Sequence, residues 1–367
     1  MRILFLAPFG SCRKQTVRRR LLPLAGAMAA RGHDVRALIP PWDCPQETGR
    51  RQVAGVDARW LASGAGVADV HPRLLRELQR EIAAFAPDAL IVSKGLGYAG
   101  LAMRWWLRRG GRAVLDVDDL EDGRGWGAQR PALLRWLLTR QERALQRSAA
   151  GVVAASRFLA ADVRARQPDQ RILTLPNGLA RAPERARVER NGRVALLLTR
   201  GHDVSARRLA AVWRAVLSRV ADAELMVVGD WPDAPATLPR ATVRGWLDGA
   251  AYSDAIRGAA LCFFLPEDKP VLRAKSPARL LDCVAQGLPV ATLDVGEYGA
   301  LAQAAGGVVV ASEAELVSWA AKLLRSSEMR RAQGRRIWRL AERLSWSRRA
   351  AELDAWLDGL FSTAKIA

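Results

Sequence analysis

Short apolar segments with the character of strands alternate with longer helical segments, and this alternation constrains the fold more than any other feature. Residues 3–7 form an apolar strand, residues 17–31 a helical stretch with Thr16 as its candidate cap, and residues 34–39 the next strand. A strand, a helix and a second strand in this order form a unit whose two strands run parallel. The chain is therefore expected to belong to the α/β class.

The same pattern recurs and divides the chain in two. Further strands are expected at residues 89–92, 113–117, 149–155 and 171–175. A charged stretch without periodicity at residues 181–192 has the character of an interdomain linker. The alternation then restarts with a strand at 194–199, a helix at 207–220 and strands at 225–228, 262–265, 289–293 and 308–311. Two similar α/β domains with a cleft between them are the expected outcome.

The length of 367 residues is enough to give each of two domains its own core. No apolar run approaches the length that spans a bilayer, and the apolar start is too short for a signal peptide, so we expect the protein to fold in the cytoplasm. The cysteines Cys12, Cys44, Cys262 and Cys283 have no paired spacing, and only three histidines are present. We expect free, mostly buried thiols and neither a disulfide framework nor a zinc site.

The formal net charge of +20 suggests an anionic partner, such as a phosphate substrate, acidic lipid headgroups or nucleic acid. Nearly all of the positive charge is arginine, and alanine, glycine and leucine are abundant. This usage is typical of a high-GC genome, so the charge by itself decides little. No arginine-rich tail, finger spacing or basic motif with interleaved aromatics marks a nucleic-acid module, and we expect no nucleic-acid partner.

Residues 273–292 combine a loop, a helix and a buried strand, with phosphate-binding chemistry where the loop meets the helix. Ser276 is a natural N-cap and Pro277 a natural first helical residue. The free N–H groups of the first turn would then point outward beside Arg273 and Lys275, as they do at anion sites on helix N-termini.

Two more side chains strengthen this pattern. Arg279 adds a third cation, and Asp282 offers a carboxylate one turn later that could accept hydrogen bonds from a ribose diol. The segment therefore predicts a site for a nucleoside diphosphate that carries a further group. The alternative is an ordinary amphipathic helix with solvated charges. That alternative does not explain cations crowded at a helix N-terminus, where the macrodipole disfavours positive charge unless an anion is present.

Ligands of parallel sheets bind at the carboxyl ends of the strands, and two loops with suitable residues lie there. Residues 8–10 follow the first strand, and Gly10 would let the backbone approach a ligand closely. Carboxylates end or follow the strand at 113–117, at Asp116, Asp118, Asp119, Glu121 and Asp122. Oxygen ligands of this kind suit hard metal ions, but acidic loops after strands are more often helix caps and solvated turns. We expect no metal site.

Five stretches in order resemble the retaining GT-B glycosyltransferases of glycosyltransferase family 4. They are MRILFLAPFG with LAGAMAARGHDV, AAGVVAASRFLA with RILTLPNGLA, ELMVVGD with VRGWLDG, KSPARLLDCVAQGLPVA, and LSWSRRAAELDAWL. The resemblance covers nearly the whole chain. It implies two Rossmann-like domains facing across a cleft, with a C-terminal helix that crosses back to the first domain.

The resemblance also implies a division of labour. Residues 1–182 would form the acceptor-side domain, residues 183–345 the domain that binds the nucleotide sugar, and residues 346–367 the returning helix. The implied activity is transfer of a sugar from a nucleoside-diphosphate sugar to an acceptor hydroxyl with retention of configuration. Neither a metal nor another cofactor is implied.

Residues of the family's donor site carry over position by position. Asp282 matches the second acid of the paired-acid motif, shortened by a methylene, whereas the first acid falls on Ala274. Glu267 or Asp268 would have to replace the missing acid, or the donor sugar is bound differently. Arg200 resembles the family's diphosphate-binding arginine, and Lys275 or Arg207 would supply the second cation.

Many relatives place a histidine near the reacting sugar, after the strand that here ends at Val117. This chain offers Asp118 instead, and His33 belongs to a different loop. Arg200, Lys275 and Asp118 are thus the expected catalytic residues. The expected donor-binding residues are Arg273, Ser276, Ala278, Arg279, Asp282, Gly245 and Trp246, and the expected acceptor-side residues are Phe9, Gly10 and Asn177.

Two functional hypotheses follow. In the first, the chain is an active retaining glycosyltransferase in which cations stabilise the departing nucleoside diphosphate. In the second, suggested by Ala274, it is a non-catalytic relative that binds sugar nucleotides or a partner glycosyltransferase. A dehydrogenase is disfavoured because no G-x-G-x-x-G follows any strand.

The acceptor is expected to be lipid-linked or a saccharide. Tryptophan with arginine at residues 104–109 and the basic stretch at 330–349 favour peripheral association with an anionic membrane surface on the inner face of the cell membrane. The alternative for residues 104–109 is a normal helix with buried tryptophans and solvated arginines.

Overall fold

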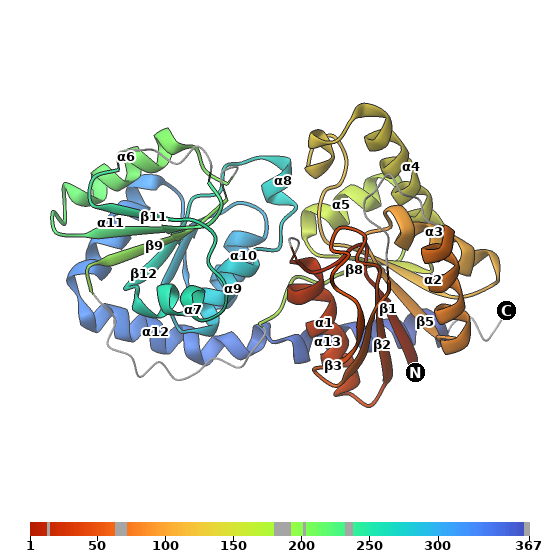
Figure 1. Cartoon of the computed structure of the whole chain (residues 1–367). Coiled ribbons are helices and arrows are strands. Elements are labelled where there is room, and N and C mark those ends of the chain that lie inside the picture. The colour runs from red at the N-terminus through yellow and green to blue at the C-terminus, as the bar shows by residue number, and fades with distance from the viewer. Residues whose placement is uncertain (13–14, 63–71, 180–191, 201–202, 232–237, 363–367) are drawn as a thin grey trace. The chain divides into compact units, whose positions relative to one another are not determined.

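The protein is described by a computed structural model that covers residues 1–12, 15–62, 72–179, 192–200, 203–231 and 238–362. It splits into two compact units (Figure 1). Unit 1 comprises Met1–Asn177, Ala274–Ser276 and Trp346–Ala367, and unit 2 comprises Gly178–Arg273 and Pro277–Ser345. The expected linker at 181–192 lies almost entirely outside the described residues. Each unit is built on one sheet, as the strand–helix alternation predicts.

The sheet of unit 1 has the strand order β3-β4-β2-β1-β5-β6-β7-β8, and its strands are parallel except for the edge strand β3. The strands are β1 (Arg2–Leu6), β2 (Asp34–Ile39), β3 (Gly49–Val53), β4 (Val56–Trp60), β5 (Ala89–Ser93), β6 (Ala113–Val117), β7 (Gly151–Ala154) and β8 (Ile172–Thr174). The helices are η1 (Val17–Leu21), α1 (Leu22–Ala29), α2 (Pro72–Phe85), α3 (Gly97–Arg108), η2 (Trp126–Gln129), α4 (Ala132–Ser148), α5 (Arg157–Arg166) and α13 (Trp346–Ser362).

The sheet of unit 2 is fully parallel, with the order β11-β10-β9-β12-β13-β14. Its strands are β9 (Val194–Leu198), β10 (Glu224–Val228), β11 (Ala241–Arg244), β12 (Leu261–Phe264), β13 (Val290–Leu293) and β14 (Val308–Val310). Its helices are α6 (Ala206–Leu217), α7 (Gly249–Gly258), α8 (Pro270–Arg273), α9 (Ala278–Ala285), α10 (Glu297–Ala304), α11 (Glu313–Arg325), α12 (Ser327–Ala341) and η3 (Glu342–Leu344).

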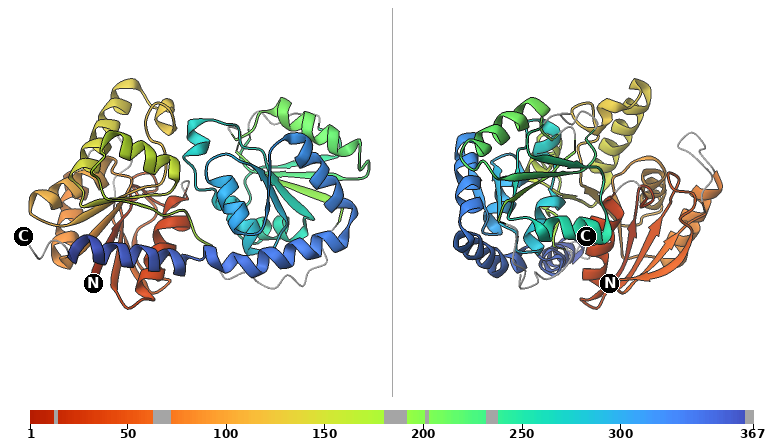
Figure 2. Two further views of the ribbon diagram at one scale, coloured as in Figure 1. Left: turned by 180° about the vertical axis from the view of Figure 1, so that it is seen from behind. Right: turned by 60° about the vertical axis from the view of Figure 1, so that its left-hand side comes forward.

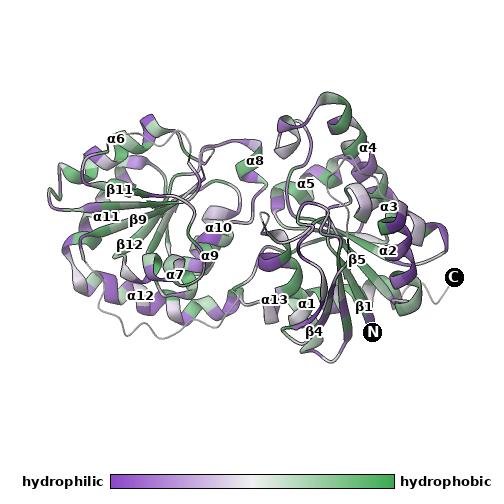
Figure 3. Ribbon diagram, viewed as in Figure 1, coloured by the Kyte–Doolittle hydropathy of each residue, from purple (hydrophilic) through white to green (hydrophobic). Residues whose placement is uncertain are grey.

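Both faces of each sheet are covered by helices, so the central strands are mostly apolar (Figure 3). In β1 the alternation of side chains sends Ile3 and Phe5 into the core shared with α1 and α13. Leu4 and Leu6 point to the opposite face and join the core beneath α2 and α3.

The C-terminal helix α13 belongs to unit 1, as expected, and packs along α1 (Figure 2). Its buried face consists of Trp346, Ala350, Leu353, Leu357, Leu360 and Phe361. Asp354 fixes the contact, because its carboxylate lies 2.8 Å from His33 Nε2 and 2.7 Å from a terminal nitrogen of Arg31. His33 thus serves this helix contact.

The hairpin β3–β4 is absent from the strands expected above. Its turn places Ala54 and Gly55 at φ 51° and 80°, the left-handed conformation that both central residues of a type I′ turn require. Alanine is unusual at such a position, so Ala-Gly gives a weaker turn signal than Asn-Gly.

One expectation about the cysteines is wrong. Cys12 and Cys44 form a disulfide, whereas Cys262 and Cys283 are free and buried as expected. The bond joins the loops that follow β1 and β2. Because these strands are parallel neighbours, their carboxyl ends meet, although the two cysteines are 32 residues apart.

Candidate functional site

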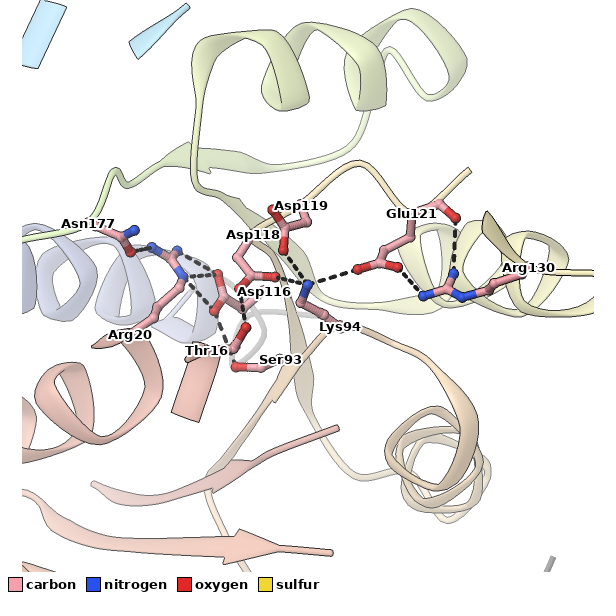
Figure 4. A network of polar contacts seen from close by, with 10 residues as sticks. All are labelled: Thr16, Arg20, Ser93, Lys94, Asp116, Asp118, Asp119, Glu121, Arg130 and Asn177. Carbon is pink, nitrogen blue, oxygen red and sulfur yellow. Dashed lines mark hydrogen bonds and ion pairs between the residues drawn. The ribbon is translucent and has the colours of Figure 1, made fainter. Parts of the chain in front are cut away.

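A buried network of charges occupies the carboxyl edge of the sheet in unit 1 (Figure 4). Lys94 follows β5, and Asp118 and Asp119 follow β6, so adjacent parallel strands deliver them to one place. Lys94 has φ 51°, a left-handed conformation that costs free energy for a residue with a Cβ. Strain of this kind is concentrated at functional sites.

Lys94 is the centre of the network. Its Nζ lies 2.5 Å from Asp119 Oδ2, 2.8 Å from Glu121 Oε1 and 3.2 Å from Asp118 Oδ1. Burial acts to lower the pKa of Lys94, but the surrounding carboxylates outweigh it and raise the pKa well above its usual value. The ammonium group is therefore permanently charged and holds the acidic loop in place.

Arg20 anchors the other end of the network. Arg20 is 1% exposed, and its guanidinium binds Asp116 in a bidentate manner, with Nη2 2.6 Å from Oδ1 and Nε 2.9 Å from Oδ2. Its Nη1 donates to the Leu175 carbonyl and to Asn177 Oδ1. Arg20 lies in η1, which is a π-helix, and such bulges are frequent at functional sites.

Asp118 is the carboxylate most able to exchange a proton. Its Oδ2 accepts a hydrogen bond of 3.1 Å from Thr16 Oγ1, so Thr16 contacts Asp118 and makes no side-chain cap, contrary to our expectation. Burial raises the pKa of Asp118 to about 7, Lys94 opposes this increase, and Asp119 adds to it. A carboxyl group with this pKa is partly protonated at neutral pH.

Glu121 and Glu142 extend the network beneath the loop. Burial acts to raise the pKa of Glu121, but Lys94 and Arg130 lower it to about 2. Glu142, on α4, is buried, and its Oε1 has no hydrogen-bond partner among the described residues. Burial, reinforced by Glu121, raises the pKa of Glu142 to about 8. It lines a small cavity together with Asp162.

The acidic loop is therefore neither a set of helix caps nor a solvated turn. Its carboxylates are paired with cations of the protein itself, Lys94 and Arg20 at the edge of the sheet and Arg124 at Asp122, although these cations do not balance every carboxylate. Among the described residues, ligand-type atoms gather closely enough for a metal only at Cys12, Cys44 and Glu47, where they lie within 4.8 Å. There the sulfurs form the disulfide, and Glu47 accepts hydrogen bonds from Ser11.

The expected acceptor-side residues lie near this network. Phe9 is buried, with its ring centre 5.8 Å from Lys94 Nζ. At Gly10 a Cβ atom would lie 2.7 Å from the Cβ of Cys44, so the absence of a side chain makes room for that cysteine. The acceptor-side role expected for Gly10 stays a prediction.

Asn177 forms hydrogen bonds through its backbone N–H and through both polar atoms of its side chain. Its Oδ1 accepts from Arg20, its backbone N–H donates to Ser276 Oγ over 2.7 Å, and its Nδ2 donates to the Ser276 carbonyl. Lys275 lies next to Ser276, with its Nζ 5.6 Å from the centre of the Trp126 ring. The segment Ala274–Ser276 is thus part of unit 1.

The contact with Asn177 corrects the expected start of α9. Ser276 is not the N-cap, because its hydroxyl accepts from Asn177. The helix begins at Ala278, and Pro277, with ψ 91°, takes the cap position without a side-chain hydrogen bond. The turn therefore starts one residue later than the serine–proline signal predicts.

In unit 2, Arg200 and Trp246 come together from different strands. Arg200 follows β9, Trp246 follows β11, and the guanidinium carbon of Arg200 lies 5.6 Å from the Trp246 ring centre. Trp246 is 51% exposed, and Gly245 beside it is also exposed. This leaves an aromatic face open to solvent next to a cation.

Asp203 joins Arg200 to Arg279. Its Oδ2 accepts from the backbone N–H of Arg200 over 2.9 Å and from Arg279 Nη2 over 2.8 Å. The other terminal nitrogen of Arg279, Nη1, is buried and has no hydrogen-bond partner among the described residues. A buried guanidinium nitrogen without an acceptor is costly, so this position suits an anionic ligand.

The remaining donor-site candidates have protein partners. Asp282 Oδ2 accepts a hydrogen bond of 2.8 Å from the Tyr252 hydroxyl. Arg273 is exposed and pairs with Asp268, so both charges are engaged outside the Arg200–Arg279 cluster. Glu267 accepts from the backbone N–H of Ser205.

Sequence reasoning missed several of these residues. Lys94 and Arg20 are absent from the residues expected above, although a lysine directly after a buried strand is a usable signal. Asp203 and Tyr252 have no local signal, since their roles depend on contacts with Arg279 and Asp282, 76 and 30 residues away.

Comparison with known proteins places both halves of the chain in one functional class. Residues 15–178 match the family described as "Glycosyl transferase 4-like domain", and residues 181–355 match the family described as "Glycosyl transferase-like". No curated protein sequence matches the chain.

Solved structures share the fold at low identity. A sucrose-phosphate synthase from Thermosynechococcus elongatus has a TM-score of 0.71 at 15% identity, covering 99% of this chain and 100% of that one. WaaG, a glycosyltransferase involved in lipopolysaccharide biosynthesis, has a TM-score of 0.63 at 18% identity, covering 98% and 99%. A putative UDP-N-acetylglucosamine 2-epimerase from Listeria monocytogenes has a TM-score of 0.59 at 15% identity, covering 98% and 97%. The fold is therefore common to transferases and to a putative epimerase.

Proposed function

The chain belongs to the GT-B glycosyltransferases, and we propose that it moves a sugar from a nucleoside-diphosphate sugar to an acceptor hydroxyl with retention of configuration. The observation that carries this proposal is the buried Nη1 of Arg279, which has no partner among the described residues and lies beside Asp203 and Arg200. A diphosphate supplies the acceptor oxygens that this nitrogen lacks.

The donor would be held by unit 2. Arg200 and Arg279 meet the diphosphate, Trp246 offers a stacking face, and Asp282 accepts from the ribose. Positive charge aimed at the departing diphosphate stabilises the transition state because negative charge develops there. Lys275 is proposed as a further cation for the same group.

The acceptor hydroxyl would attack from the face on which the diphosphate leaves. The leaving phosphate oxygen takes the acceptor's proton, so the step needs no protein base, metal or other cofactor. Asp118 in unit 1 is proposed to contact the reacting sugar, where its pKa of about 7 lets it donate or accept a hydrogen bond.

A second candidate function is sugar-nucleotide binding without turnover. Ala274, which stands where the family has its first acid, is 0% exposed and packs in the apolar core of unit 1. No carboxylate is available at that position. We keep the enzyme as the main proposal because the cluster of Arg200, Asp203 and Arg279 is intact.

Calorimetric titration of UDP, GDP, ADP and dTDP tests the donor site. One diphosphate is expected to bind the wild type, and Asp282→Asn to weaken it by roughly 1.5–3 kcal/mol, or about ten- to a hundredfold, because a charge-assisted hydrogen-bond pair is lost. Asp254→Asn, on the exposed side of α7, is the matched control and should bind like the wild type. Equal affinities of all three proteins would remove Asp282 from the site.

Kinetics separate the two candidate functions. Arg200→Ala and Lys275→Ala should lower kcat more than they raise the donor KM, since these cations act on charge that develops in the transition state. The anomeric configuration of the product, read by NMR, decides retention. Tight diphosphate binding with neither transfer nor donor hydrolysis would favour the second candidate.

We also propose a cytoplasmic location on the inner face of the cell membrane, with a lipid-linked or saccharide acceptor. Across the described residues, no helix combines the length and apolarity needed to cross a bilayer. Binding to the membrane would therefore involve a surface formed by these residues, or segments outside them.

A further inference from the structure

Helix α4 carries a concentration of exposed apolar side chains. Seven large hydrophobic residues of the described chain are exposed, and three of them lie on this helix: Leu133 at 70%, Trp136 at 55% and Leu137 at 48%. Burial of each such side chain would contribute roughly 1.5–3 kcal/mol of free energy. Clusters of exposed apolar side chains therefore mark interaction sites.

The three side chains form one stripe. Positions 133, 136 and 137 have the spacing of neighbours on a helix surface, and Arg140 and Arg147 continue the same line. The guanidinium of Arg140 lies 5.4 Å from the centre of the Trp136 ring. We call these five residues the α4 face. The opposite side, with Glu142, Leu145 and Gln146, is buried in unit 1.

The charges that α4 itself exposes are all positive, and a neighbouring carboxylate, Asp122, lies 3.8 Å from a terminal nitrogen of Arg143. The only acidic residue of α4 is Glu142, which is buried. The neighbouring helix α3 contains no acidic residue and exposes Arg104 and Arg108. It packs against α4 through Gln141, whose side chain exchanges two hydrogen bonds with the Gly97 backbone.

We propose that the α4 face docks onto an anionic lipid surface, with Leu133, Trp136 and Leu137 at the boundary of headgroups and acyl chains and the arginines on lipid phosphates. Tryptophan and leucine on one side of a basic helix suit this interface. The proposal deepens the proposed function, because it brings unit 1, the acceptor side, to a lipid-linked acceptor.

A second copy of the chain fits the α4 face less well. A two-fold dimer would place the patch against itself, so that Arg140 and Arg147 would face the same arginines of the other copy. The segments expected from sequence to meet the membrane expose less apolar surface than the α4 face. Trp105 and Trp106 are half-buried against the core, and Met329 is the sole exposed large hydrophobic residue in the described part of α12.

Flotation with vesicles tests the proposal. The wild type is expected to float with vesicles that contain phosphatidylglycerol and to stay behind with phosphatidylcholine alone. Trp136→Ser combined with Leu137→Ser should weaken partition at least about tenfold. Arg140→Gln should weaken it about fivefold, because each basic residue near such a surface contributes about 1 kcal/mol. Met329→Ser, an equally exposed apolar residue on a basic helix, is the matched control and should float like the wild type.

Each other result overturns the proposal. If the wild type fails to float at low salt, or floats equally with both vesicle types, the protein does not bind an anionic lipid surface. If the Trp136→Ser/Leu137→Ser variant floats fully, the α4 face is not the binding surface. A wild-type dimer in light scattering that the same variant dissociates would assign the face to a second copy. Diphosphate titration without vesicles separates this outcome from a failure of the proposed function, because the α4 variants should bind like the wild type.

Discussion

At the scale of single residues, the network in unit 1 has one more carboxylate than it has cations. The cations are Arg20, Lys94 and Arg130, and the carboxylates are Asp116, Asp118, Asp119 and Glu121. A buried cluster cannot keep an uncompensated charge cheaply, so one carboxylate is driven to bind a proton. Asp118 is that group, with its pKa raised to about 7.

Glu142 gives a pH-dependent stability that can be measured. Its folded-state pKa of about 8 lies above the ordinary 4.5, so the folded protein holds this proton more tightly than the unfolded chain. The contribution is complete below pH about 4.5 and is lost as the pH rises through about 8. A tenfold difference in proton affinity corresponds to about 1.4 kcal/mol, so the loss amounts to several kcal/mol. Glu142→Gln, which cannot ionise, should therefore be more stable than the wild type at pH ~9 in urea unfolding.

The comparison at pH ~4 is the control, since position 142 is then largely neutral in both proteins, folded and unfolded, and they should unfold at similar urea concentrations. Asp118 titrates over an overlapping range and helps to raise the pKa of Glu142, so the difference between the two proteins reports Glu142 together with its coupling to Asp118. An identical decline of both proteins from pH ~4 to ~9 would contradict the assignment.

The sequence pattern predicts the positions of residues such as Arg200 and Asp118. Each directly follows an apolar strand, so it lies at the carboxyl edge of the sheet. The pattern fails for Glu142, whose burial is decided by other elements. A glutamate within a polar stretch of helix looks solvated until the loop and helix that cover it are known.

At the scale of elements, the loops after β1 and β2 are tied by the disulfide between Cys12 and Cys44. Closing a loop of 32 residues restricts the unfolded chain, which corresponds to roughly 3–4 kcal/mol in the chain-entropy model. A reductant should lower the unfolding free energy of the wild type by about this amount. It should leave a variant with both Cys12→Ser and Cys44→Ser unchanged.

Alkylation under non-reducing denaturing conditions provides the covalent check. With the disulfide formed, only Cys262 and Cys283 react, and reduction exposes all four cysteines of the chain. Four reactive thiols before reduction would return the pair to the free state that sequence spacing suggests.

The strands of both sheets follow closely from the sequence, because buried parallel strands are continuous apolar runs bounded by turns. The expected ranges 34–39 and 113–117 coincide with β2 and β6. The edge hairpin cannot be predicted in this way. Every residue of β3 is exposed or only partly buried, so its sequence shows no apolar pattern that indicates a strand. The disulfide cannot be predicted from the sequence pattern either, because it depends on which strands become neighbours in the sheet.

At the scale of the whole molecule, α13 is the element that the chain sends back to unit 1 after completing unit 2. Deleting everything after Ser345 removes six buried side chains, among them Leu353, Leu357 and Phe361, and uncovers the surface of α1 against which they pack. Each large side chain is worth roughly 1.5–3 kcal/mol when buried. The truncated protein should therefore be poorly soluble.

A milder substitution keeps this prediction measurable if the truncation cannot be purified. Leu357→Ala leaves the helix in place but opens a cavity, and it should lower the unfolding free energy by about 2–5 kcal/mol. Asp358→Ala, one residue on and exposed, is the matched control and should change it by no more than about 0.5 kcal/mol. A soluble truncation that unfolds like the full chain, or equal stability of both substitutions, would show that α13 contributes little to unit 1. The returning helix would then be a feature of chain topology and not of stability.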